Sequence, residues 1–209
     1  MSRNLAGMLR LVLVTDDALL GGRDLVALCL AAERGGVTAV QLRLKHADGR
    51  ALADAARALM AVLRVPLFLD DRLDVALATG AAGVHLGPDD LPLAMARGIA
   101  PPGFVLGASV GTPQEVAQGI GADYWGVGPL RATTTKADAG QAIQLEGFSA
   151  VCRMAPVGVP CVAIGGVRAE DVPMVAGVGG AGVAVVRGIL GTDDVERAAR
   201  EYARGIPRS

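Results

Sequence analysis

The chain has 209 residues, of which 52% are hydrophobic and 20% charged, and its mean hydropathy is +0.43. The formal net charge of −1 and the isoelectric point of about 6.1 exclude a general attraction to nucleic acid or to acidic membranes. No stretch reaches the uncharged length that crosses a bilayer, and the N-terminal apolar run lacks a signal-peptide cleavage site, so we expect a cytoplasmic protein.

Short apolar runs alternate along the chain with alanine-rich stretches of helical length. The predicted strands are Leu11–Thr15, Thr38–Lys45, Leu67–Asp71, Gly83–Gly87, Phe104–Ser109, Tyr124–Gly128, Cys161–Gly166 and Gly182–Arg187. The predicted helices are Asp24–Arg34, Gly49–Leu63, Leu73–Thr79, Leu91–Arg97, Pro113–Gly119, Leu145–Met154, Ala169–Val175 and Asp193–Ala203. Near-continuous apolar strands indicate a parallel sheet covered by helices. We predict an α/β fold, a (β/α)8 TIM barrel in which residues 1–209 form a single domain, with a doubly wound open sheet as the alternative.

The second predicted strand carries long polar side chains at every second position. Gln41, Arg43 and Lys45 are expected on one face, opposite apolar residues such as Leu44. A cation buried without a partner is costly, so this face is expected to meet water or an anion.

Other polar residues follow the ends of later strands, where TIM barrels bind their ligands. Asp70 and Asp71 follow the third strand, and Asp89 and Asp90 follow the fourth. Either pair could cap a helix, but the two pairs together favour a shared Mg²⁺ ion.

A second anion site is predicted from the later strands. The segment Thr133–Lys136 follows a Gly-Pro turn with three hydroxyls and a lysine, and Gly165 and Gly166 form a turn beside the end of the eighth strand. His85 is expected to be packed rather than a ligand, and His46 to be exposed. Cys29, Cys152 and Cys161 have no metal-ligand spacing and are expected to be free thiols. Two anion sites with a metal between them fit small phosphorylated substrates.

The motifs that carry these residues resemble one enzyme family, in order and over nearly the whole chain. The segments VTDD, QLRLK, LDDRLDVAL, GVHLGPDDL, GASV, GADYWGVGPLRATTTK, VAIGGV and GVAVV are similar to thiamine-phosphate synthase (thiamine phosphate pyrophosphorylase). The resemblance implies a transferase of thiamine biosynthesis that joins hydroxymethylpyrimidine pyrophosphate and hydroxyethylthiazole phosphate with Mg²⁺. The products would be thiamine phosphate and pyrophosphate.

The resemblance also implies a role for each site residue. The pyrophosphate would be held by Gln41, Arg43 and Lys45, and the magnesium by Asp71 and Asp90. Lys136 would neutralise the leaving group and Ser109 would contact the pyrimidine or the departing oxygen, so that Lys136, Ser109 and Arg43 are the expected catalytic residues. The thiazole phosphate would be bound by Thr133, Thr135, Gly166 and the amides near Val186 and Arg187. Asp70 would also face the substrate.

The chain departs from the family pattern at five positions in or near these motifs. Asp70 replaces Asn, Pro88 replaces Gln, Gly111 replaces His, Leu44 replaces Glu and Arg187 replaces Ser. The alternatives are a thiazole tautomerase, which relies on a histidine at the place of Gly111, and a non-catalytic barrel that binds thiamine phosphate. The sequence leaves the oligomeric state open, with a homo-oligomer as one option.

Overall fold

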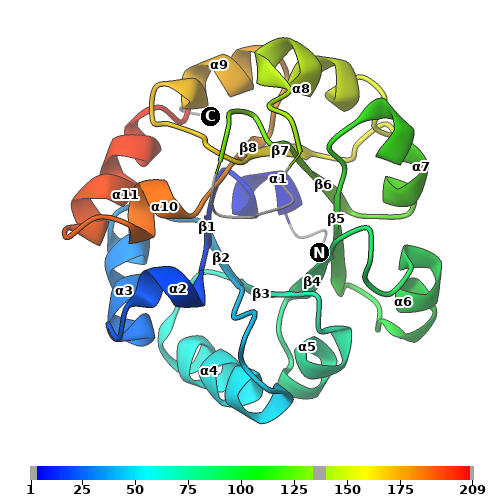
Figure 1. The fold of residues 1–209 in the computed structure, drawn as a ribbon. Helices are drawn as coiled ribbons and strands as arrows, with labels where there is room; N and C mark the ends of the chain where they lie inside the picture. The colour runs from blue at the N-terminus through cyan, green and yellow to red at the C-terminus, as the bar shows by residue number, and fades with distance from the viewer. Residues whose placement is uncertain (1–3, 134–139, 208–209) are drawn as a thin grey trace.

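The strands form a closed barrel. The computed structural model describes residues 4–133 and 140–207. Within them, β1 to β8 pair in parallel and in sequence order, and β8 returns to β1 (Figure 1). The strands are β1 (Leu11–Val14), β2 (Ala39–Leu42), β3 (Leu67–Asp70), β4 (Gly83–Leu86), β5 (Val105–Ser109), β6 (Tyr124–Val127), β7 (Cys161–Ile164) and β8 (Gly182–Val185). The predicted TIM barrel is confirmed, and the closed strand order excludes the open sheet.

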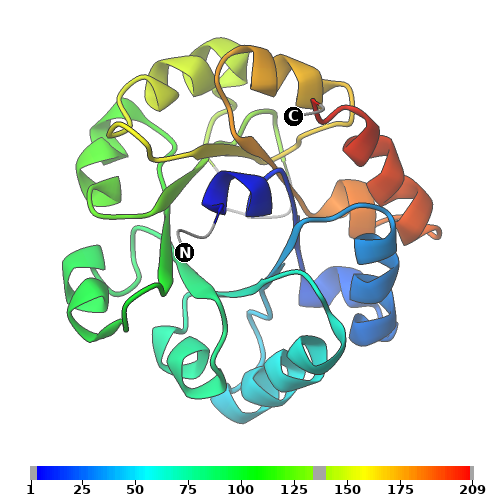
Figure 2. The ribbon, with the colours of Figure 1, turned by 180° about the vertical axis from the view of Figure 1, so that it is seen from behind.

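Helices surround the barrel, as predicted (Figure 1). They are α1 (Leu5–Met8), α2 (Asp17–Leu20), α3 (Leu25–Arg34), α4 (Gly49–Val62), α5 (Leu73–Thr79), α6 (Leu93–Ile99), α7 (Val116–Gly119), α8 (Gln144–Cys152), α9 (Asp171–Gly177), α10 (Arg187–Leu190) and α11 (Val195–Arg204), with a 3-10 turn at Pro113–Glu115. The short α1 differs from the rest, because it lies across the opening of the barrel seen in Figure 2. Of the described helices, none has the length and apolar character needed to span a membrane.

Alternation along the strands divides the apolar residues into two cores. One cluster, which includes Val12, Phe68 and Tyr124, fills the barrel interior. The larger cluster, which includes Leu13 and Leu69, packs between the strands and the helices. Because neighbouring residues of a strand face opposite sides, interior residues such as Val12 and Phe68 are followed by outer-core residues, here Leu13 and Leu69. The same alternation decides which polar residues near a strand end can reach the barrel mouth.

The second strand is shorter than predicted. It ends at Leu42, so Arg43 and Lys45 lie in the loop beyond it. The physical reason is the side chain of Thr15, whose Oγ1 accepts a hydrogen bond from the Arg43 amide at 2.8 Å and donates one to the Arg43 carbonyl at 3.1 Å. These bonds replace the next step of the strand ladder.

The eighth strand is also shorter than predicted, because it ends at Val185 and α10 begins at Arg187. Three one-turn helices, α1, α2 and α10, were not predicted, since four residues hold too little periodicity to reveal a helix. Asp16 begins α2 by accepting a hydrogen bond from the Leu19 amide at 3.2 Å.

The three cysteines are free thiols, as predicted. Cys29 and Cys161 are buried, and Cys152 is partly buried. The neighbouring Cys161 side chain, together with burial, raises the pKa of the Cys152 thiol.

Candidate active site

A cavity of about 590 Å³ lies at the carboxyl ends of the strands. It brings together every predicted site residue that the structure describes: Gln41, Arg43, Lys45, Asp70, Asp71, Asp90, Ser109, Thr133, Gly166, Val186 and Arg187. The other two, Thr135 and Lys136, lie outside the described residues. Placement at one cavity follows from the geometry of a parallel barrel, in which all strands end at the same face.

Strand register selects the side chains that line this cavity. Asp70 of β3 pairs with His85 of β4, and Ser109 of β5 pairs with Gly126 of β6. All four line the cavity. Leu44 packs against the outer core instead, so its departure from the family pattern does not change the cavity surface.

Arg43 lies between two carboxylates. Its Nη1 donates to Asp16 Oδ2 at 2.6 Å, and its Nε is 3.6 Å from Asp70 Oδ2. Gln41 Nε2 donates to the other oxygen of Asp70. Burial, together with the charge of Asp71, raises the pKa of Asp70 to about 7, although Gln41 and Arg43 oppose the shift. These contacts fix the Arg43 guanidinium in one orientation.

Asp16 supports the candidate site through Arg43, a role that the sequence did not predict. Its only local signal was its place in the VTDD motif, which gives no indication of its partner. The structure shows it nearly buried, at 5% exposure, holding both Arg43 and the start of α2.

A second carboxylate pair lies beside Lys45, whose Nζ donates to Asp71 Oδ2. Asp90 lies next to Asp71, and its Oδ2 accepts a hydrogen bond from the Gly87 amide at 2.6 Å. Burial raises the pKa of Asp90, and Asp71 raises it further, while the Gly87 amide lowers it. Burial lowers the pKa of Lys45, but Asp71 and Asp70 outweigh burial and the net shift is upward.

These carboxylates do not cap helices, which removes the alternative interpretation of both aspartate pairs. The N-cap positions of α5 and α6 are Arg72 and Pro92, and neither makes a side-chain capping bond. Asp71 has a positive φ of 63°, a conformation that Asp tolerates better than most residues, and this turn directs its side chain to Lys45.

The opposite side of the cavity is built from glycines and backbone. Gly165 and Gly166 have φ of 84° and 63°, and a Cβ on Gly166 would lie 2.8 Å from the Ala132 carbonyl oxygen. The amides of Leu130 and Arg131 donate to the carbonyls of Ile164 and Gly165 at 2.8 and 2.9 Å. The β6–α8 loop therefore starts in direct contact with the Gly165–Gly166 turn.

An ion pair between Arg131 and Asp171 holds the start of the β6–α8 loop. Arg131 donates to both oxygens of Asp171, at 2.9 and 2.6 Å, and the Arg168 amide donates to Asp171 at 2.8 Å. Asp171 is only 2% exposed. Burial alone would raise the pKa of Asp171, but Arg131 and the Arg168 amide hold it below its ordinary value. No sequence pattern predicts this contact, because its two residues lie in different βα units.

The cavity therefore has two chemically different sides. We call Asp16, Arg43, Lys45, Asp70, Asp71 and Asp90 the charged half. We call Gly128, Gly165, Gly166, Thr133, Val186 and Arg187 the glycine half. Arg187, an exposed residue at the first position of α10, adds one cation at the rim of the glycine half.

His85 is buried, as predicted, at 8% exposure, whereas His46 is exposed. The Nδ1 of His85 lies 3.0 Å from the Tyr124 hydroxyl and its Nε2 lies 3.0 Å from Ser109 Oγ. The predicted burial of His85 and exposure of His46 are confirmed. Tyr124 was not singled out from the sequence, because an interior aromatic residue in a strand is usually part of the core.

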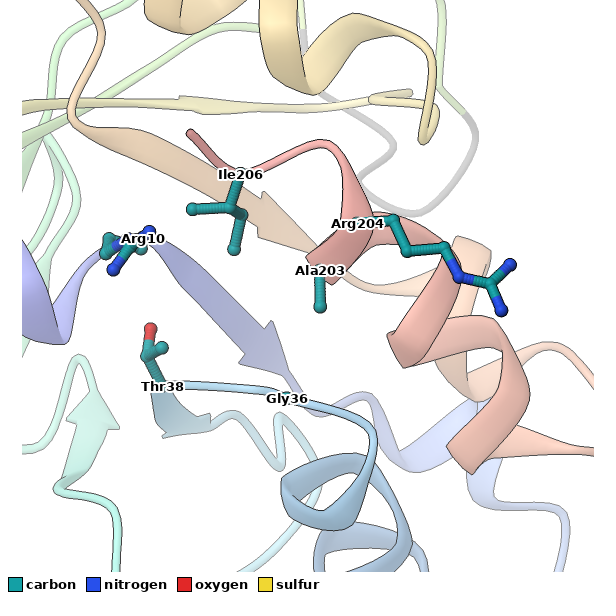
Figure 3. Close-up of a pocket in the computed structure, with 6 residues that line it drawn as sticks. All are labelled: Arg10, Gly36, Thr38, Ala203, Arg204 and Ile206. Atoms are coloured by element: carbon teal, nitrogen blue, oxygen red, sulfur yellow. The ribbon is translucent and has the colours of Figure 1, made fainter. Parts of the chain in front are cut away.

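Another cavity, of about 380 Å³, lies away from the strand carboxyl ends and is lined by Arg10, Gly36, Thr38, Ala203, Arg204 and Ile206 (Figure 3). Arg10 donates to the Pro207 carbonyl at 2.5 Å, and Arg204 points away from the other lining residues. Its polar groups do not converge on a ligand position, so the chemistry is assigned to the cavity at the strand ends.

The sequence and the fold of the chain are similar to those of known proteins. The family described as thiamine monophosphate synthase matches residues 11–189. Thiamine-phosphate synthases of Azorhizobium caulinodans and Xanthobacter autotrophicus are 49% and 50% identical to the chain, covering 92% and 95% of both sequences. The solved thiamine phosphate pyrophosphorylase of Pyrococcus furiosus has a TM-score of 0.87 and 36% identity, and covers 97% of this chain and 98% of its own. A 3-hexulose-6-phosphate synthase structure, with a TM-score of 0.72 and 18% identity over 95% of this chain, shares the fold. The chain belongs to the thiamine monophosphate synthase family.

Proposed function

We propose that the cavity joins hydroxymethylpyrimidine pyrophosphate to hydroxyethylthiazole phosphate, giving thiamine phosphate and pyrophosphate. The observation that carries this proposal is the meeting of the charged half and the glycine half in one cavity. Each half suits a different phosphorylated end. Family membership and the relatives' names support the same reaction.

The charged half is assigned to the pyrophosphate. Arg43 offers directed N–H donors, Lys45 offers a point charge, and Gln41 orients Asp70 beside them. Because Asp16 and Asp71 hold the two cations before the substrate arrives, little reorganisation is needed when negative charge develops on the leaving group.

Asp71 and Asp90 are the proposed magnesium ligands. Their contact and the raised pKa of Asp90 show two carboxylates crowded at one point of the cavity wall, which a divalent cation would relieve. No group of three or more His, Cys, Asp or Glu side chains in the described parts of the chain is arranged to hold a metal. Two carboxylates plus substrate phosphate oxygens match the usual coordination of Mg²⁺. When bound, the ion would supply positive charge to the pyrophosphate oxygens.

The proposed reaction exchanges one bond for another at the pyrimidine methylene carbon. The bond from this carbon to the pyrophosphate oxygen breaks, and the oxygen keeps the electron pair. The pyrimidinylmethyl cation is then captured by the lone pair of the thiazole nitrogen. No proton is transferred in either step, so the protein must position the substrates and stabilise charge rather than supply a general base.

The glycine half is assigned to the thiazole phosphate. The Gly166 turn, the backbone near Val186 and Arg187, and the side chain of Thr133 face the cavity. Arg187, where the family pattern has serine, adds a cation that suits a phosphate. Thr135 and Lys136 keep the roles inferred from the resemblance, as thiazole phosphate and leaving-group contacts.

The lack of space for a side chain at Gly111 argues against the tautomerase alternative. A Cβ at this position would lie 2.5 Å from the Gly128 carbonyl oxygen, so the backbone leaves no room for the histidine on which that activity relies. The Gly111 amide also donates to Glu115 at 2.5 Å, which fixes the local backbone.

The test is to mix the purified chain with both substrates and Mg²⁺ and to quantify thiamine phosphate and pyrophosphate by mass spectrometry. Equal formation of the two products, lost when either substrate is omitted or EDTA is added, is expected. Tight binding of thiamine phosphate without any turnover would instead identify a non-catalytic barrel.

A further inference from the structure

Three hydrogen-bonded side chains, Tyr124, His85 and Ser109, cross the wall of the candidate site. Tyr124 and His85 have no role in the reaction described above. Tyr124 of β6 and Ser109 of β5 approach opposite nitrogens of the His85 ring on β4, each at 3.0 Å. Tyr124 is 3% exposed, whereas Ser109 is partly exposed and lines the cavity. These three hydrogen-bonded side chains therefore connect the barrel interior to the place where substrate would lie.

Two glycines make space for the rings. Gly107 pairs with both His85 and Tyr124 in the strand register. A Cβ on Gly107 would lie 2.2 Å from the Tyr124 ring, and a Cβ on Gly126 would lie 2.9 Å from His85 Cε1. The two ring centroids are 5.5 Å apart. A flip of the imidazole would place its carbon atoms against the two hydroxyls and lose both hydrogen bonds, so the two nitrogens do not exchange partners.

The hydroxyl of Tyr124 sets the direction of the hydrogen bonds. Among the described residues, Nδ1 of His85 is the partner that the structure gives to this hydroxyl. If Nδ1 carried the proton, the phenol would accept and its own buried O–H would lack an acceptor, which costs free energy. Burial raises the pKa of Tyr124, so the phenol keeps its proton at neutral pH. Tyr124 therefore donates to Nδ1.

The remaining directions follow from the tautomer. A neutral imidazole that accepts at Nδ1 carries its proton on Nε2, so His85 donates to Ser109 Oγ. With its oxygen already accepting from His85, Ser109 turns its own O–H toward the cavity. The opposite arrangement would present a lone pair of Ser109 to the substrate instead.

We infer that Tyr124 and His85 are positioning residues that make Ser109 a directed hydrogen-bond donor to an acceptor atom of the pyrimidine pyrophosphate. This inference rests on the proposed function for the identity of the ligand, but its geometry does not depend on turnover.

The direct test is NMR of the chain with ¹⁵N-labelled histidine. The chain has two histidines, and the His46→Gln variant assigns the pair of signals that remains to His85. We expect His85 to be protonated at Nε2 in the wild type and to lose this single tautomer in Tyr124→Phe. A wild-type His85 protonated at Nδ1 would overturn the inference, even in an enzyme that makes thiamine phosphate. The NMR result is independent of activity, so failure of the proposed function would be seen separately.

Kinetics supply the second readout. Tyr124→Phe keeps the ring and removes the donor, so kcat should fall about tenfold while KM for the thiazole phosphate stays unchanged. Ser109→Ala should lose at least as much, and the double variant should lose no more than Ser109→Ala alone, because both changes act through the same hydroxyl. Losses that multiply in the double variant, or wild-type kcat in a folded Tyr124→Phe variant, would contradict the inference.

Discussion

The two halves of the cavity present physically different surfaces to a ligand. In the charged half, cationic side chains are fixed by carboxylates, as Arg43 is by Asp16 and Lys45 by Asp71. In the glycine half, the backbone itself forms the surface, with positive φ at Gly165 and Gly166. The difference suits the ligands. A leaving group that gains charge is stabilised by fixed cations, whereas a phosphate that keeps its charge can be held largely by close backbone donors.

The largest effect is expected from Arg43→Ala. The change removes the central cation and leaves Asp16 and Asp70 buried near each other without it. We expect kcat/KM for the pyrimidine substrate to fall about a thousandfold or more, and the free energy of unfolding to fall by about 3 kcal/mol. Steady-state kinetics and denaturant unfolding measure the two losses.

Arg43→Lys provides the matched control, because it keeps the charge but cannot make both contacts. It should lie between the wild type and Arg43→Ala. Arg34→Ala removes an arginine that is 60% exposed and pairs with Glu196 on the surface, and should leave kcat/KM unchanged. A folded Arg43→Ala variant within tenfold of the wild type would contradict the assignment of the charged half.

Asp71→Asn should weaken the dependence on magnesium. Removing one charged ligand is expected to raise the Mg²⁺ concentration for half-maximal activity about tenfold or more. Asp74→Asn, at an exposed aspartate paired with Arg72, is the control and should titrate like the wild type. Superimposed Mg²⁺ titration curves for Asp71→Asn and the wild type would reject Asp71 as a ligand.

Gly166→Ala probes the glycine half. Its positive φ costs about 1 kcal/mol for alanine, and the new Cβ would also meet the Ala132 carbonyl oxygen at 2.8 Å. We expect KM for the thiazole phosphate to rise about tenfold and KM for the pyrimidine substrate to stay unchanged. Gly179→Ala carries comparable strain, with φ of 93° and no heavy atom within 4 Å, and should affect stability alone. Equal rises in both KM values would count against two separate halves.

Arg131→Ala should have the smallest effect. The loop start keeps its backbone bonds to Ile164 and Gly165, so KM for the thiazole phosphate is expected to rise only about threefold. Arg97→Ala is matched to it, since its partner Asp123 likewise accepts a backbone amide, from Leu106, but lies away from the cavity. A selective KM change in Arg97→Ala, and none in Arg131→Ala, would show that this ion pair does not position the loop.

The barrel itself was predictable, because eight apolar runs separated by helical stretches leave few alternatives. The positions at which the strands end were predicted less accurately. Thr38–Lys45 was expected as one strand, but the Thr15 side chain takes over the backbone bonds of Arg43. No local sequence pattern predicts such a contact between neighbouring strands.

The position of these strand-end residues in one cavity was predictable for the same topological reason, whereas their partners were not. Asp16 meets Arg43, and Arg131 meets Asp171, only after the barrel has set the strand register. The hydrogen-bonded chain through His85 likewise joins three strands. Sequence periodicity reports which face a residue occupies, but it carries no information about what lies across from that face.

The division of the site is tested most directly by calorimetric titration of two ligands into two variants. Pyrophosphate with Mg²⁺ and hydroxyethylthiazole phosphate are each titrated into the wild type, Arg43→Lys and Gly166→Ala. We predict that Arg43→Lys loses affinity for pyrophosphate alone and that Gly166→Ala loses affinity for the thiazole phosphate alone. Loss of both ligands to the same degree in either folded variant would contradict the account.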